Sequence, residues 1–332
     1  MSTRIAAAIV CLAAVPALFA AGAALAQAPS DSVIVPGTQE EQAVARFVEA
    51  SVTPTRMTGK TARWESPICV GLQGIKPEEA AYIVKRLKQN AADVRVRVNV
   101  KADCDPNIEI IFTDQPQGVM DQVKESQPDL LGYFDNKDER DQLAIVKRPI
   151  QAWYRTATQD VRGQTYVDGS RATDAPARGV TVMMPCANTS GNRQLQVRNG
   201  VQIFAGVPNS ICPREFAAIK ANTPGFALQD GLRSQFDHIS IVVDTGKVAA
   251  LKADAVTDYI SMVALAQLSS LDSCLDLASI TNILVPGCAA TADTLSVNDT
   301  AYLRGVYRAD PTLAPAAQKG QIVSQMGKAR ER

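Results

Sequence analysis

Histidine is almost absent from this sequence, which contains a single one, His238, in 332 residues. A zinc hydrolase with a His-Glu-x-x-His helix needs two imidazoles one helical turn apart and a carboxylate that acts on the bound water. One imidazole cannot supply that pair of ligands. The sequence therefore excludes a zinc site of this type.

Other signatures of chemistry are also missing. The chain has no Gly-x-Ser-x-Gly turn to expose a nucleophilic serine and no glycine-rich loop to hold a phosphate group. Lys and Arg together number 34, as do Asp and Glu. Because neither charge dominates, we expect neither nucleic acid nor an anionic membrane surface as a partner. Because the motifs that hold a metal or phosphate are missing, we expect no resident metal or other cofactor.

The first residues have the composition of a secretory signal peptide. Arg4 precedes an apolar run over residues 5–25, and a small-residue cleavage pattern ends at Ala26. The alternative is an N-terminal membrane anchor, since about 20 apolar residues can just span a bilayer. No later apolar run approaches that length, so we expect a periplasmic or secreted protein without a membrane span after cleavage.

Six cysteines remain once Cys11 has left with the signal peptide, and none lies in a Cys-x-x-Cys pair. An even number of cysteines in an exported chain favours disulfides over metal ligands. Six free buried thiols are the alternative. We predict that neighbours pair along the chain: Cys69 with Cys104, Cys186 with Cys212, and Cys274 with Cys288.

Helical and extended patterns alternate along the first half of the chain, which favours an α/β or α+β layer. Helical spacing predicts helices over residues 40–52, 76–90 and 117–125. Strand patterns cover residues 62–74, 93–103, 107–114 and 150–159. Over 93–103, the valines at 94, 96, 98 and 100 alternate with polar residues, as in a half-buried strand. A further strand is expected over 179–186 and a helix over 212–222.

The segments from residue 236 onward resemble the end of a zincin-like domain. A strand over 236–248 leads to an apolar helix at about 254–268, a Ser-Ile-x-Asn-like segment follows at 279–282, and residues 295–308 form a closing helix that begins with a Leu-x-x-x-Asp pattern. In zincins the strand before the active-site helix is an edge strand. This layout resembles a family of exported alphaproteobacterial proteins that lack the His-Glu-x-x-His zinc ligands.

The resemblance implies a single zincin-like α+β domain, a mixed sheet with packed helices, over residues 41–315. The signal peptide over 1–26 and a polar linker over 27–40 precede this domain. A C-terminal helix or tail over 316–332 follows it.

The helix at about 254–268 corresponds to the active-site helix of zincins, but in degenerate form. Its best match to the zinc motif is Asp-Tyr-Ile-Ser-Met over 258–262. Asp258 is a weak candidate ligand, methionine binds Zn²⁺ poorly, and tyrosine cannot act as the carboxylate base. Because the helix is apolar nearly all round, we expect it to be deeply buried and to stabilise the domain.

His238 is the remaining candidate for catalysis. On a regular strand its face would also present Phe236, Ser240 and Val242. One interpretation is a core or edge histidine with one hydrogen bond. The other is a catalytic base whose ring is oriented by Asp244 or Asp258.

Two functions remain open at this point. The first is a non-catalytic zincin-like binding or envelope module that acts through its surface on a protein or another envelope partner. The second is a peptidase-like hydrolase with a non-standard site that includes His238. A purely structural envelope protein would differ from the first only in having no partner.

Overall fold

The computed structural model describes residues 38–101, 103–168 and 231–330, together with the backbone of the short strands β5 (Gln196–Arg198), β6 (Val201–Ile203) and β7 (Ser210–Ile211). Several predictions of the sequence lie outside the described residues. They are the signal peptide, the pair Cys186 and Cys212, the strand at 179–186 and the helix at 212–222.

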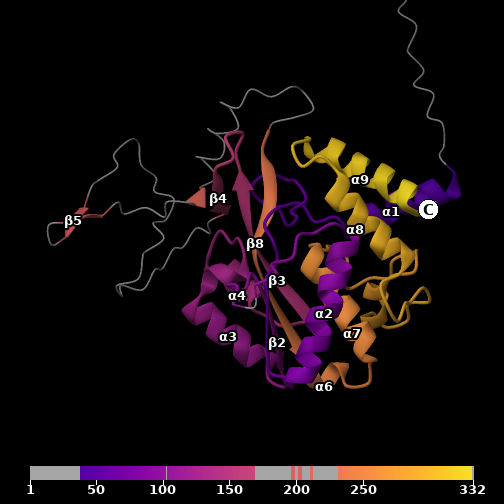
Figure 1. The fold of residues 1–332 in the computed structure, drawn as a ribbon, viewed down its shortest axis with the longest axis horizontal. Helices are drawn as coiled ribbons and strands as arrows, with labels where there is room; N and C mark the ends of the chain where they lie inside the picture. Colours follow the sequence, from indigo (N-terminus) through magenta and orange to yellow (C-terminus); the bar gives the residue numbers. More distant parts are fainter. Residues whose placement is uncertain are drawn as a thin grey trace, which may run out of the picture. The chain divides into compact units, whose positions relative to one another are not determined.

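A mixed six-stranded sheet forms the centre of the fold, with the strand order β1-β2-β8-β3-β4-β7 (Figure 1). Its other strands are β1 (Val70–Gln73), β2 (Ile108–Thr113), β3 (Ile150–Gln159), β4 (Thr165–Asp168) and β8 (Arg233–Asp244). Strands β1, β2 and β8 are parallel, and β3 is antiparallel to both β8 and β4. The prediction of a mixed sheet with packed helices is confirmed. Strand β8 pairs on both sides, so it is an interior strand and not the edge strand of a zincin.

Helices cover both faces of this sheet. Their bounds are α1 (Gln39–Ser51), α2 (Pro77–Asp93), α3 (Pro116–Ser126), α4 (Lys137–Leu143), α6 (Thr245–Val248), α7 (Ala253–Leu265), α8 (Val297–Arg308) and α9 (Pro315–Arg330), with 3₁₀ turns η1 (Pro128–Leu131) and η2 (Ile280–Leu284). Helix α7 packs on β3 and β8, and α2 and α8 pack on α7. The other face of the sheet packs against α3 and η1. Among the described residues, no helix has the length and apolar composition needed to cross a bilayer.

Helix α1 begins inside the segment predicted to be a linker. Thr38 is its N-cap, and the hydroxyl of Thr38 and the carboxylate of Glu41 form a capping box. At the other end of the chain, α9 packs against α8 and α1. Its Ile322 and Met326 are fully buried in the main core, so this helix belongs to the packed domain.

The strand predicted over residues 93–103 does not form. Helix α2 continues to Asp93 and ends in a Schellman motif, in which Arg95 and Val96 donate to the carbonyls of Ala92 and Ala91. Arg95 occupies the left-handed position that glycine usually takes, with φ of 66°. Val94 and Val96 are therefore buried at the helix exit, and the described residues of the predicted strand keep only an isolated parallel bridge between Val98 and Ile68. Val100, the last valine of the repeat, is 94% exposed.

A bulge in β8 changes which side chains share a face. Thr156 pairs with Phe236 and Arg155 pairs with His238, so Asp237 is an extra residue in β8. Phe236 consequently joins the core on the α7 face, whereas His238 lies on the opposite face with Ser240 and Val242. The prediction that Phe236 shares the face of His238 is wrong, because one inserted residue reverses the alternation.

Helix α7 is buried along its whole length from Ala255, as predicted from its apolar sequence. It ends at Leu265, however, and residues 266–268 are not helical. Side chains from three distant segments donate to carbonyls of its last turn at 2.8 Å: Tyr154 to Val263, Trp64 to Ala264 and Tyr307 to Leu265. These donors allow a helix end to lie in the core without a glycine cap.

Two of the three predicted disulfides are confirmed. Cys69 is bonded to Cys104, which joins the start of β1 to the loop before β2. Cys274 is bonded to Cys288, which closes the loop that contains η2. Disulfides persist in oxidising compartments, so both bonds agree with a location outside the cytoplasm.

Candidate functional site

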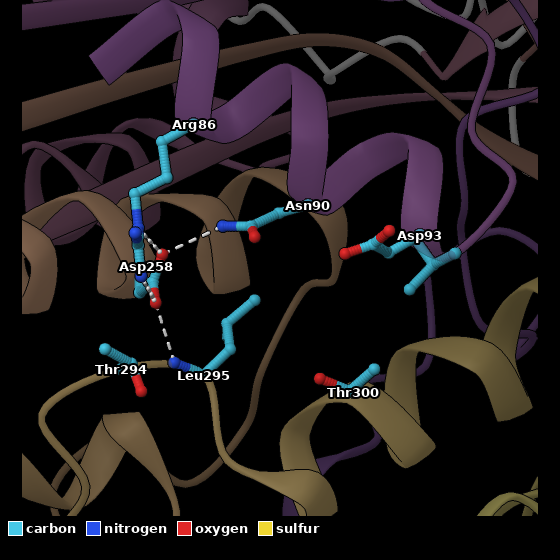
Figure 2. A pocket seen from close by; sticks show the side chains of 8 residues that line it. Arg86, Asn90, Asp93, Asp258, Thr294, Leu295 and Thr300 are labelled. Atoms are coloured by element: carbon cyan, nitrogen blue, oxygen red, sulfur yellow. Dashed lines mark hydrogen bonds and ion pairs between the residues drawn. The ribbon is translucent and has the colours of Figure 1, made fainter. Parts of the chain in front are cut away.

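A pocket of about 180 Å³ opens beside Asp258, where α2, α7 and the first turns of α8 meet (Figure 2). Its walls come from the C-terminal half of α2, from α7, and from the loop that enters α8. The lining residues are Arg86, Asn90, Asp93, Val94, Asp258, Thr294, Leu295 and Thr300.

Asp258 lies at the base of this pocket and is 1% exposed. Its Oδ1 accepts from Arg86 Nε at 2.6 Å and from Asn90 Nδ2 at 2.9 Å. Its Oδ2 accepts from Arg86 Nη2 and from the backbone N–H of Leu295, both at 2.8 Å. A carboxylate has about four lone-pair sites, and all four accept hydrogen bonds here. The carboxylate therefore has no lone pair left for a metal ion.

Helical spacing places these partners opposite one another. Tyr82, Arg86 and Asn90 recur every four residues along one face of α2 and meet Asp254 and Asp258, which are four residues apart on α7. The hydrogen bonds from Arg86 to Asp258, together with the charges of both aspartates, raise the pKa of Arg86 above its usual value. These two stripes are the sequence signal for the site, although nothing in the sequence indicates that they face each other.

The remaining residues of the degenerate zinc motif are also used for packing and for hydrogen bonds inside the protein. The Ser261 hydroxyl donates to the carbonyl of Thr257, and Tyr259 and Met262 are buried in the main core. Within residues 38–101, 103–168 and 231–330, no three His, Cys, Asp or Glu side chains cluster as metal ligands do.

His238 lies on the other face of the sheet from Asp258. Its Nε2 is 3.6 Å from Oε2 of Glu109 on β2, a distance too long for a hydrogen bond. Burial lowers the pKa of His238, and Glu109 opposes that effect. The buried Ser240 hydroxyl has no hydrogen-bond partner among the described residues. A serine nucleophile bonded to its base is therefore not assembled in this arrangement.

The two residues expected to orient His238 have other roles. Asp244 is the N-cap of α6 and accepts from the backbone of Gly246 and Lys247. Asp258 is bound by Arg86, Asn90 and Leu295, as described above.

The two motif segments after α7 form a buried network. The Asp299 carboxylate accepts from the Ser279 hydroxyl at 2.6 Å and from the backbone N–H groups of Ile280 and Ser296, both at 2.8 Å. The Asn282 side chain accepts from the backbone N–H of Leu275 and donates to its carbonyl. These motif residues thus fix the loop between α7 and α8.

Comparison of the chain with protein-family models, curated proteins and solved structures gave no match.

Proposed function

We propose that this chain is an exported, zincin-like protein without peptidase activity, which acts in the periplasm or outside the cell as a binding module. Its partner is a protein or another envelope component. The observation that carries the proposal is the Asp258 carboxylate. At the position where a zincin places a zinc ligand, this carboxylate accepts four hydrogen bonds from the protein itself.

The surroundings of α7 support the same proposal. The helix has no solvent-exposed face, and three aromatic side chains bind the carbonyls of its last turn. A substrate carbonyl could reach residues 258–262 only if this packing opened. The pocket beside Asp258 remains accessible, and we assign binding to that pocket and its rim.

The chain order supports the zincin-like part of the proposal. Strand β8 leads through α6 into the buried helix α7, the segment at 279–282 follows, and α8 closes the domain. Asp299 holds that segment to the start of α8. The interior position of β8 is a departure from zincins.

The proposal is tested with purified protein and with intact cells. The protein should hold far less than one zinc per chain by elemental analysis, and added zinc should not induce cleavage of a peptide library. Stoichiometric zinc accompanied by cleavage would overturn the proposal. A photo-crosslinking residue at Thr294, on the pocket rim, should capture an envelope partner in cells. The same residue at the exposed Val161 should not.

The pair of His238 and Glu109 favours a second candidate, a hydrolase in which His238 is the base. If the protein hydrolyses any ester or peptide substrate, His238→Gln should abolish that activity. An unchanged rate would remove this candidate.

A further inference from the structure

We infer that the pocket beside Asp258 binds a primary ammonium group on a short aliphatic chain, with Asn90 Oδ1, the Asp93 carboxylate and the Thr300 hydroxyl as acceptors. This inference rests on the proposed binding function and specifies its ligand. The ammonium group belongs either to a free amine or to a lysine side chain of a protein partner.

Asp258 engages most of the N–H donors that line the pocket. Arg86 Nε and Nη2 and the backbone N–H of Leu295 all donate to Asp258, and Arg86 Nη1 lies 3.7 Å from Asp254 Oδ1. The Asn90 amide nitrogen donates to Asp258 and to Ser261. Arg86 keeps N–H groups on Nη1 and Nη2 that make no hydrogen bond, but Asp254 lies beside Nη1 and its negative charge opposes a phosphate or carboxylate ligand there.

Acceptors, in contrast, are unused. Because the amide nitrogen of Asn90 is fixed by the carboxylate of Asp258, which can only accept, the amide oxygen must point away from Asp258. Figure 2 shows this oxygen, the Asp93 carboxylate and the Thr300 hydroxyl around one space. None of these three groups makes a hydrogen bond to another residue within the described ranges. Three acceptors match the three N–H groups of a primary ammonium.

The charge of the site favours the same ligand. Among the lining residues, Asp93 and Asp258 are acidic and only Arg86 is basic. On the rim, Asp254 faces Arg86, and Arg304 donates to the backbone carbonyl of Asp93, so these two rim charges offset each other. The net charge of −1 resides on Asp93, whose carboxylate has no ion-pair partner among the described residues.

The apolar part of the ligand follows from the other walls. Val94 and Leu295 line the pocket, and Figure 2 places the Leu295 side chain between Asn90 and Thr300. A volume of about 180 Å³ holds an ammonium group with a few methylene groups.

The test is a calorimetric or NMR titration of the full mature chain with n-butylammonium chloride, with 1-butanol as the uncharged analogue. Butylammonium should bind and butanol should not. Asp93→Asn should weaken binding about tenfold, because it removes the unpaired charge, and Thr300→Val should weaken it a few-fold. Asp93 lies on the surface, so neither the fold nor the Asp258 network depends on it.

Asp293→Asn is the matched control, because Asp293 pairs with Lys252 and does not line the pocket. Its affinity for butylammonium should equal that of the wild type. Equal affinity of the Asp93→Asn variant, or equal binding of butanol, would overturn the inference.

Crosslinking at Thr294 separates the two sources of the ammonium group. If butylammonium competes away a captured protein, a lysine side chain of that protein is the ligand. If butylammonium binds and no protein is captured, the ligand is a free amine, and the protein partner expected under the proposed function is contradicted. A captured protein that butylammonium does not displace would overturn the inference and leave the proposed function standing. If no protein is captured and butylammonium does not bind, both the inference and the proposed function are overturned.

Discussion

Two buried aspartates of this protein show how differently a fold can accommodate a carboxylate. Asp258 is 1% exposed and lies against the guanidinium of Arg86, with Asn90 and a backbone N–H as further donors. Asp168, at the end of β4, is 5% exposed, and its described partners are the hydroxyls of Thr156 and Thr158. The charge of Asp258 is compensated by a cation, whereas that of Asp168 is only solvated by two hydroxyls. Removing the cation beside Asp258 should therefore destabilise the fold, and removing the charge of Asp168 should stabilise it.

The largest effect is expected for Arg86→Met. This change removes the cation and two hydrogen bonds but leaves the Asp258 carboxylate buried, which should lower the free energy of unfolding by about 3 kcal/mol. Urea or guanidinium unfolding of the purified protein measures this loss. The double variant Arg86→Met with Asp258→Leu should recover part of the loss, because no buried charge is left.

Arg46→Met is the matched control for this comparison. Arg46 pairs with Asp276 at 2.9 Å, but the two side chains are 59% and 60% exposed. Its loss should change the free energy of unfolding by less than about 1 kcal/mol. Equal losses for Arg46→Met and Arg86→Met would contradict the role given to burial.

A smaller effect of opposite sign is expected for Asp168→Asn. Burial raises the pKa of Asp168 from 3.8 to about 6, so the folded protein binds a proton more tightly than the unfolded chain. Stability should therefore fall as pH rises through this window, by on the order of 2–3 kcal/mol, and stay low above it. Asp168→Asn cannot ionise and should remove this loss, which makes it more stable than the wild type at pH 7.

Unfolding midpoints measured between pH 4 and pH 8 test this expectation. Asp114→Asn is the control, because Asp114 is exposed. It should keep the pH profile of the wild type. If Asp168→Asn keeps that profile too, the ionisation of Asp168 is not its origin.

The parts of the fold that could be predicted from the sequence are those with a local cause. The apolar surface of α7, the apolar run of β2 and the spacing of four cysteines each depend on neighbouring residues, and the structure confirms them. The bulge at Asp237 and the left-handed Arg95 carry no such signal, because both occur without the glycine that usually marks them. They account for the two errors in β8 and at 93–103.

Only part of the candidate site could be predicted from the sequence. Asp258 was identifiable from its place in the degenerate motif, but its partner Arg86 lies 172 residues earlier in the chain. The four-residue spacing along α2 shows which side chains share a face, not which helix they meet. Pairings of this kind are set by packing of the whole domain, which a single sequence does not specify.

The smallest effect is expected for Thr158→Val, beside Asp168. The hydroxyl of Thr158 donates to Oδ1 of this carboxylate at 2.8 Å and, like that of Thr156, lowers the pKa that burial raises. Thr158→Val should therefore raise the pKa of Asp168 further and move the upper end of the pH window upward, at a cost of about 1 kcal/mol at neutral pH. In the Asp168→Asn background the shift should vanish, because no titrating group remains. A shift that persists there would mean that Thr158 acts through packing and not through the carboxylate.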